Sequence, residues 1–200
     1  MNKLLKFALG TLIIFMLVSC SFTPSPETIV TDYSRVLSSH DVDSLMTYYS
    51  DDIVFDIPQM SMYLEGKNAL RGVAEYDSVL GTIMTLGELS SFGDTVFCSI
   101  TEKNKWLTIA GIDSAYYPKA TFIISNNHIS VIQAELSDST ERQMRTVMSS
   151  FIPWLNENFP HYVRLMMPDG KFIFNAKHGE LILMLLSQWS QQKMMGFPAE

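Results

Sequence analysis

The chain has 200 residues, a length that suits one domain of ordinary size with an additional segment rather than two full domains. Its hydrophobic fraction of 47% and charged fraction of 18% are globular values and exclude a disordered or fibrous chain. The formal net charge of −7 argues against a nucleic-acid-binding protein, because such proteins need a basic surface to neutralise phosphates.

The first residues are typical of an export signal. Lys3 and Lys6 form a short basic region, and the apolar run 7–18 follows directly. A helix rises about 1.5 Å per residue, so this run is too short to cross a hydrocarbon core of about 30 Å. The run therefore predicts the apolar region of a signal peptide rather than a membrane span.

The end of this run resembles the lipobox of bacterial lipoproteins. The sequence Leu17-Val18-Ser19-Cys20 places small residues directly before a cysteine. The resemblance implies a signal peptide at 1–19 and a diacylated Cys20 that anchors the protein in the membrane of the bacterial cell envelope, since two or more acyl chains anchor stably. Ser21 after the cysteine favours the outer membrane, with the protein facing the periplasm or the surface. The alternative is a plain secretory signal in which Cys20 is incidental.

After a Pro/Ser-containing tether at 20–26, the pattern predicts helices and then strands. Ser25 followed by Pro26 is typical of a helix start, and Asp41 is placed to cap a second, short helix. The alternation at 53–57 predicts a strand that Pro58 ends. A short strand at 60–65 and a third helix to residue 80 follow.

The rest of the chain divides into a strand-rich part and a helical part. Asn126-Asn127 predicts a hairpin, and Asp138 is placed to cap a long helix. A last helix is predicted at about 176–193. Further strand-like runs are 82–89, 94–102, 105–112, 118–125 and 128–136. Helices followed by antiparallel strands indicate an α+β fold rather than alternating α/β.

Four segments resemble the nuclear transport factor 2-like superfamily, in its SnoaL-like and ketosteroid-isomerase-like branch. They are Tyr33 in the first helix, 40–43 before the second helix, 49–55, and 65–71 at the start of the third helix. The resemblance implies an α+β domain at 27–137 in which N-terminal helices pack in the concave face of a strongly curved antiparallel sheet, a cystatin-like cone with an apolar pocket. Residues 138–200 are then a C-terminal helical extension packed on this domain.

Isomerase-like members of that branch use a tyrosine, a strand carboxylate and a buried neutral acid. Tyr33 falls at the position of the tyrosine, but the base position falls on Ile57 and the position of the neutral acid falls on Ala120. Isoleucine cannot accept a proton. A one-residue bulge that turned Asp56 inward is the exception that would restore a base. The sequence therefore favours a protein that binds without catalysing a reaction.

The first hypothesis is thus a lipid-anchored protein that binds a small apolar ligand in the conical pocket. Strand parity and the concave face of the family predict a lining of Tyr33, Tyr49, Phe55, Ile57, Met62, Trp106, Phe122, Ile132 and Ala134. The 13 methionines of the chain either help to line this pocket or fill gaps in the core.

Two other hypotheses stay open. A SnoaL-like isomerase, cyclase or hydrolase would use Tyr33 with Asp56 or Glu135 on a cyclic or polyketide-like substrate. An interaction module would bind another envelope protein or form a homodimer through the outer sheet face, at Ile129, Val131 and Gln133. No cofactor and no metal site is predicted, because the four histidines are isolated. Cys98, the only other cysteine, is expected to be a buried structural thiol.

Overall fold

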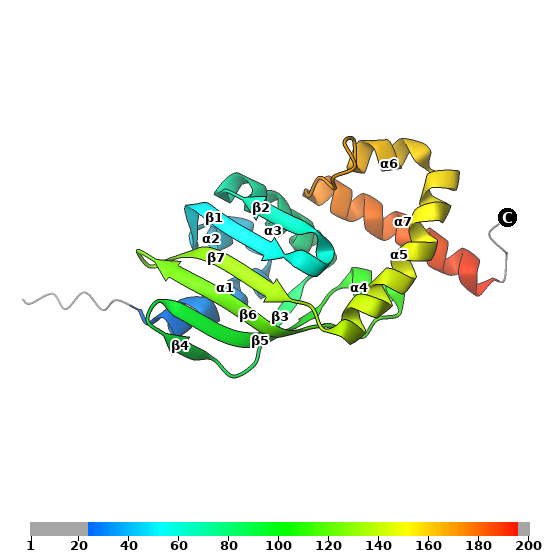
Figure 1. The fold of residues 1–200 in the computed structure, drawn as a ribbon. Coiled ribbons are helices and arrows are strands. Elements are labelled where there is room, and N and C mark those ends of the chain that lie inside the picture. The colour runs from blue at the N-terminus through cyan, green and yellow to red at the C-terminus, as the bar shows by residue number, and fades with distance from the viewer. Residues whose placement is uncertain (1–23, 196–200) are drawn as a thin grey trace, which may run out of the picture.

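The computed structural model describes residues 24–195, so the predicted signal peptide and Cys20 lie outside the described residues. A curved seven-stranded sheet has the order β2-β1-β7-β6-β5-β3, and β4 pairs with β5 alone. Figure 1 shows the N-terminal helices on one side of this sheet and the C-terminal helices beyond one end of it. The elements are α1 (Pro26–Ser39), α2 (Val42–Met46), β1 (Tyr49–Ile57), the 3-10 turn η1 (Pro58–Met60), β2 (Met62–Glu65), α3 (Lys67–Leu80), β3 (Ile83–Leu86), β4 (Ser90–Phe92), β5 (Thr95–Lys103), α4 (Lys105–Ala110), β6 (Ala115–Ser125), β7 (His128–Glu135), α5 (Asp138–Asn158), α6 (Pro160–Met166) and α7 (Ala176–Met194).

Two helix starts and one hairpin confirm what the sequence predicts. The Ser25 side chain accepts a hydrogen bond from a backbone N–H in the first turn of α1, and Asp41 does the same for α2. Asn126 and Asn127 join β6 to β7 with φ angles of 49° and 62°. Asparagine tolerates this left-handed region, which the tight hairpin turn requires at both positions.

The segment 105–112 is a correction, because it forms helix α4 and not a strand. The Asn104 side chain accepts a hydrogen bond from the backbone N–H of Leu107 at 2.9 Å, which caps the helix. Gly111 ends it with a φ of 76°. These two residues favour a short helix over a strand, and Trp106 therefore lies on α4 rather than on the sheet.

A second correction concerns the outer face of β7. The pairing of β6 with β7 shifts register between Ile123 and Ile124, which breaks the simple alternation of side chains along the strands. Ile129 is fully buried, whereas Gln133 is exposed. Ile129, Val131 and Gln133 therefore do not share the outer face that the homodimer hypothesis assumed. β1 also runs parallel to β7, so the sheet is antiparallel except at this pair.

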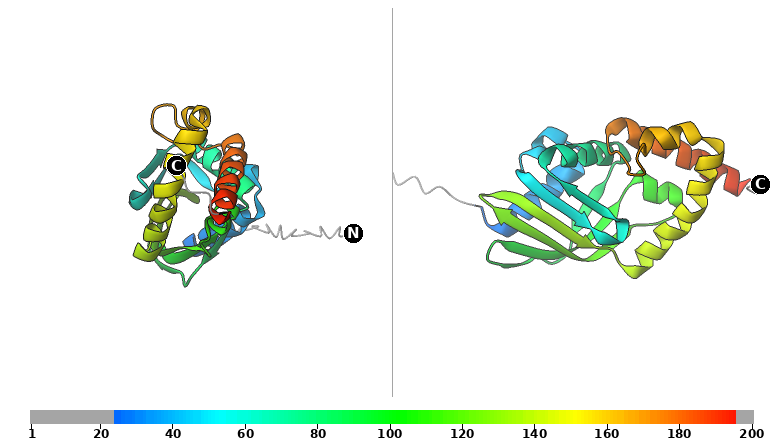
Figure 2. Two further views of the ribbon diagram at one scale, coloured as in Figure 1. Left: turned by 90° about the vertical axis from the view of Figure 1, so that its right-hand side faces the viewer. Right: turned by 45° about the horizontal axis from the view of Figure 1, so that its top comes forward.

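The C-terminal helices form an arch at the end of the sheet that is farther from the start of α1 (Figure 2). α7 packs against α3 and α4, while α5 and α6 join the end of β7 to the segment before α7. Phe151 of α5 is fully buried and stacks on Trp154 with ring centroids 6.0 Å apart. The cap of α5 is Ser137 rather than Asp138, one residue earlier than predicted. No helix within 24–195 is long and apolar enough to span a membrane.

Gly72 of α3 allows the segment before α7 to approach closely. A Cβ atom on Gly72 would lie 2.5 Å from the backbone oxygen of Phe174. Alanine usually stabilises a helix relative to glycine by about 1 kcal/mol. We expect Gly72→Ala instead to lower the free energy of unfolding by about 1–3 kcal/mol, since the carbonyl must move. Chemical denaturation measures this change, and Asn68→Ala, at an exposed position of the same helix, is the control. Equal or greater stability of Gly72→Ala would contradict the close contact.

Candidate functional site

A cavity of about 620 Å³ lies between the sheet and the C-terminal helices. The sheet and the helices α3 and α4 line one side of it with Phe55, Ile57, Met62, Val73, Tyr76, Asp77, Leu80, Glu102, Trp106, Leu107, Ala115 and Tyr117. The extension lines the other side with Glu141, Met144, Arg145, Met148, Met167, Phe172, Phe174 and Ile182. The site thus depends on both parts of the chain, because neither part encloses the cavity alone.

A smaller cavity of about 60 Å³ lies deeper, among α1, α3 and the concave face of the sheet. Six residues line both cavities and therefore mark the boundary between them: Phe55, Ile57, Val73, Asp77, Glu102 and Tyr117. Two of these six are acids. This boundary therefore places two acids at the inner end of a mainly apolar site.

Asp77 of α3 and Glu102 of β5 form this acidic pair. The two carboxylate oxygens of Glu102 accept separate hydrogen bonds, one from the side-chain amide of Asn104 at 2.7 Å and one from the hydroxyl of Tyr117 at 3.2 Å. Asp77 accepts a hydrogen bond from the hydroxyl of Thr82 at 3.3 Å. Neither acid takes part in an ion pair with any residue in 24–195.

Burial favours the protonated form of both acids. Two effects raise the pKa of Asp77 to about 8: the larger is loss of hydration, and the smaller is repulsion from Glu102. Loss of hydration also raises the pKa of Glu102, against the opposing effect of the hydrogen bonds from Tyr117 and Asn104. At pH 7 Asp77 is therefore mainly a neutral acid that can donate a hydrogen bond into the cavity.

The sequence contains a signal for both acids that the prediction of the site missed. Asp77 follows Val73 by four residues and precedes Leu80 by three, which places it on the apolar face of α3. Glu102 continues the inward alternation of β5 two residues after Ile100. An acid that stands at the same helix or strand spacing as buried apolar residues is rarely solvated. This spacing marks both Asp77 and Glu102 as buried acids.

Comparisons with known proteins address the fold. The chain resembles the epoxide hydrolase/cyclase-like enzyme SalBIII, described for its role in pyran ring formation in the polyether salinomycin. The TM-score is 0.51 at 15% identity, over 57% of this chain and 92% of that one. The chain has the nuclear transport factor 2-like fold.

Two further solved structures extend this comparison. A putative ketosteroid isomerase from Kribbella flavida matches with a TM-score of 0.48 at 13% identity, over 56% of this chain and 78% of that one. An NTF2-like protein of unknown function from Cytophaga hutchinsonii matches with a TM-score of 0.48 at 8% identity, over 57% and 92%. No protein-family model and no curated protein matches the sequence.

The positions at which the resemblance expects the isomerase groups hold no acid or base beside Tyr33. The hydroxyl of Tyr33 lies 3.1 Å from the hydroxyl of Tyr49, and burial raises the pKa of both side chains far above the ordinary value. Ile57 lines both cavities, and Ala120 is fully buried. Tyr33 is thus a buried tyrosine whose hydroxyl is hydrogen-bonded to another tyrosine.

Eight of the nine residues predicted to line a pocket do line one of the cavities. Phe55 and Ile57 line both, Met62 and Trp106 line the large cavity, and the small cavity takes Tyr33, Tyr49, Ile132 and Ala134. Phe122 is the correction. It is fully buried, its ring packs 5.9 Å from that of Tyr33, and it lines neither cavity.

The acids proposed for an enzyme, Asp56 and Glu135, line neither cavity. Asp56 accepts a hydrogen bond from the exposed Gln133 at 3.3 Å. Glu135 forms an ion pair with Lys119 at 2.8 Å, and both side chains are about half exposed. This placement argues against the enzyme hypothesis built on these two acids, because both belong to the outer face of the sheet.

The other thiol and metal-ligating side chains of residues 24–195 form no second site. Cys98 is buried, and burial raises the pKa of its thiol to about 11, so it stays protonated and unreactive at neutral pH. Among residues 24–195, no three side chains of the histidine, cysteine or acidic types gather closely enough to hold a metal ion.

Proposed function

We propose that the protein binds a small, mainly apolar molecule in the large cavity. The observation that carries this proposal is the cavity itself. Its volume of about 620 Å³ lies within the range of about 300–1,000 Å³ that is usual for small-molecule sites. Its lining is mainly aromatic and aliphatic, with one group of acids at the inner end, which is the composition expected of a ligand pocket.

The methionines of the cavity favour a ligand of loosely defined shape. Met62 comes from β2, Met144 and Met148 from α5, and Met167 from the segment after α6. Thioether side chains are flexible and polarisable, so they adapt to apolar groups of different outline. Met60 of η1 is the fifth methionine of the lining. Three of the five belong to the C-terminal extension, which the proposal therefore regards as part of the binding site.

Native mass spectrometry of the full chain, purified under native conditions, tests the proposal. We expect a stoichiometric adduct that is lost on denaturation. We also expect Ala115→Phe to lose this adduct, because the added ring occupies the cavity, whereas Ser125→Phe, exposed at the far end of β6, keeps it. A clean apo mass for the wild type would contradict the proposal, as would an adduct that survives Ala115→Phe.

A second candidate function is acid–base catalysis on the bound molecule. The observation that favours it is a protonated Asp77 beside Glu102 at the edge of a cavity, an arrangement suited to proton transfer. The SalBIII enzyme shows that this fold is compatible with chemistry. Incubation of the ligand in heavy water would reveal exchange of its carbon-bound hydrogens, and loss of the exchange in Asp77→Asn with retained binding would support catalysis. Equal exchange in both proteins would contradict it.

We further propose that lipids on Cys20 anchor this binding domain in the bacterial envelope, as the lipobox resemblance implies. The expected result is that Cys20→Ser abolishes incorporation of a labelled palmitate analogue in bacteria that express the chain. Cys98→Ser, at a buried thiol, is the matched control and keeps the label. Labelling of the Cys20→Ser protein would contradict the proposal.

A further inference from the structure

We infer that the molecule bound in the large cavity carries a cationic amine, and that Asp77 and Glu102 bind this amine at the inner end. This inference rests on the proposed binding function and names the chemical class of the ligand. Both acids line the cavity, and each comes from a rigid element, α3 or β5. A ligand that reaches the inner end must therefore meet two carboxyl groups.

The distribution of charge in the cavity favours a cation at this place. Within residues 24–195, the only basic side chain in the lining is Arg145 of α5, which is largely exposed and forms an ion pair with Glu141. No basic side chain of the described residues pairs with Asp77 or Glu102. A buried carboxylate in its charged form is unfavourable without a cation, and a bound cation removes this cost.

The hydrogen bonds leave room for the amine. The neutral donors Asn104 and Tyr117 hold Glu102 through both of its carboxylate oxygens, which fixes the direction of this group. Thr82 donates to Oδ1 of Asp77, and no residue within 24–195 donates to Oδ2. An ammonium group supplies up to three N–H donors, so it can satisfy Oδ2 of Asp77 and share the oxygens of Glu102.

Aromatic rings next to the acids favour the same ligand class. Tyr76 precedes Asp77 in the sequence. The centroid of its ring lies 5.6 Å from the ring centroid of Phe172 and 5.3 Å from that of Phe174. All three residues line the cavity together with Trp106. Aromatic faces attract cations and also pack against the apolar body of a ligand. An anionic ligand would instead be repelled by the acids.

Binding of the amine requires loss of the proton that Asp77 holds at neutral pH. The charged or titratable groups around Asp77 are Glu102 from β5 and four tyrosines, with Arg145 and Glu141 on the opposite wall of the large cavity. The tyrosines are Tyr76 from α3 itself, Tyr117 from β6, Tyr33 from α1 and Tyr49 from β1, and burial raises the pKa of all four, so they stay neutral. The proton of Asp77 passes to solvent as the ammonium binds, and binding of an amine should therefore release about one proton.

Three probes with one apolar body test this inference: 1-adamantanemethylamine, 1-adamantanemethanol and 1-adamantanecarboxylate. Titration calorimetry would use the full chain in phosphatidylcholine nanodiscs at pH 7, with empty nanodiscs as the blank. We expect the amine to bind at least about tenfold more tightly than the alcohol, and the carboxylate to bind most weakly. The measured heat of amine binding should vary with the ionisation enthalpy of the buffer, because a proton is released.

Two variants separate the contribution of the Asp77 charge to amine affinity from the contribution of the apolar cavity. Asp77→Asn should weaken amine binding by about tenfold, remove the proton release and leave alcohol binding within about threefold. Asp56→Asn, on the outer face, should change none of these. Equal affinity for amine and alcohol would overturn the inference and leave the apolar binding function intact. Failure of all three probes to bind would contradict both.

Discussion

Replacement of Asp77 by asparagine is expected to flatten the dependence of stability on pH between about pH 4 and pH 8. In the folded protein, burial raises the pKa of Asp77 from 3.8 to about 8. Between these values the folded chain holds a proton that the unfolded chain has lost, so a rise in pH favours unfolding. The stabilisation is complete below about pH 4 and is lost as the pH rises through 8.

The expected slope is up to about 1.4 kcal/mol of unfolding free energy per pH unit for one proton. Glu102, whose pKa is also raised, adds an effect of the same sign. Urea denaturation at pH 5, 6, 7 and 8 measures the slope for wild type, for Asp77→Asn and for Asp113→Asn, which replaces an exposed acid. Asparagine does not titrate, so only Asp77→Asn should be flatter. Parallel curves for wild type and Asp77→Asn would show that Asp77 is not a buried neutral acid.

The Phe151→Ala variant is expected to lower the free energy of unfolding by about 3–5 kcal/mol. Phe151 is fully buried, and its ring lies 6.0 Å from that of Trp154 and 5.6 Å from that of Trp189. Removal of the ring therefore leaves a cavity at the centre of the extension. Because α7 packs against α3 and α4, we expect the whole chain to unfold in a single transition at lower denaturant.

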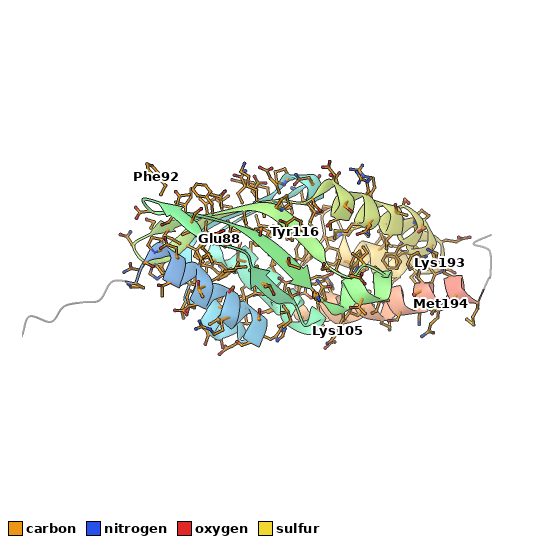
Figure 3. All side chains as sticks on the ribbon, turned by 90° about the horizontal axis from the view of Figure 1, so that it is seen from below. Glu88, Phe92, Lys105, Tyr116, Lys193 and Met194 are labelled. Carbon is orange, nitrogen blue, oxygen red and sulfur yellow. The ribbon has the colours of Figure 1, made fainter. Side chains whose placement is uncertain are left out.

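Phe92→Ala is the matched control for this prediction. Phe92 is 85% exposed on β4 and projects from the end of the molecule opposite the C-terminal end of α7 (Figure 3). Its loss should change stability by less than about 0.5 kcal/mol. Two separate transitions in Phe151→Ala, with the sheet unaffected, would show that the extension is an independent unit and does not belong to the ligand site.

Local features were the most predictable part of the fold. The caps Ser25 and Asp41 and the turn at Asn126-Asn127 depend on neighbouring residues, so sequence alone places them. The helix at 105–110 was missed because strand alternation outweighed its cap, Asn104. The burial of the Ile129 side chain was not predicted, because it depends on the shift of register between β6 and β7.

The site was less predictable, because distant segments build it. The contact between Tyr76 and Phe174 joins α3 to the segment before α7, and nothing local in either sequence indicates it. The concave face predicted from the family holds only part of the lining, since the extension supplies the other wall. The burial of Asp77 and of Glu102 could be predicted from the spacing of their apolar neighbours. Their proximity to each other could not, because it depends on how the fold places α3 relative to β5.

A crystal structure of the natively purified protein tests the central claim most directly. The binding account predicts electron density for a small molecule in the cavity between the sheet and α5. Its apolar body should contact Met144 and Phe172, and a polar group should lie within hydrogen-bond distance of Asp77 or Glu102. A collapsed cavity, with α5 packed directly against Phe55 and Ile57 and no space for a ligand, would contradict it.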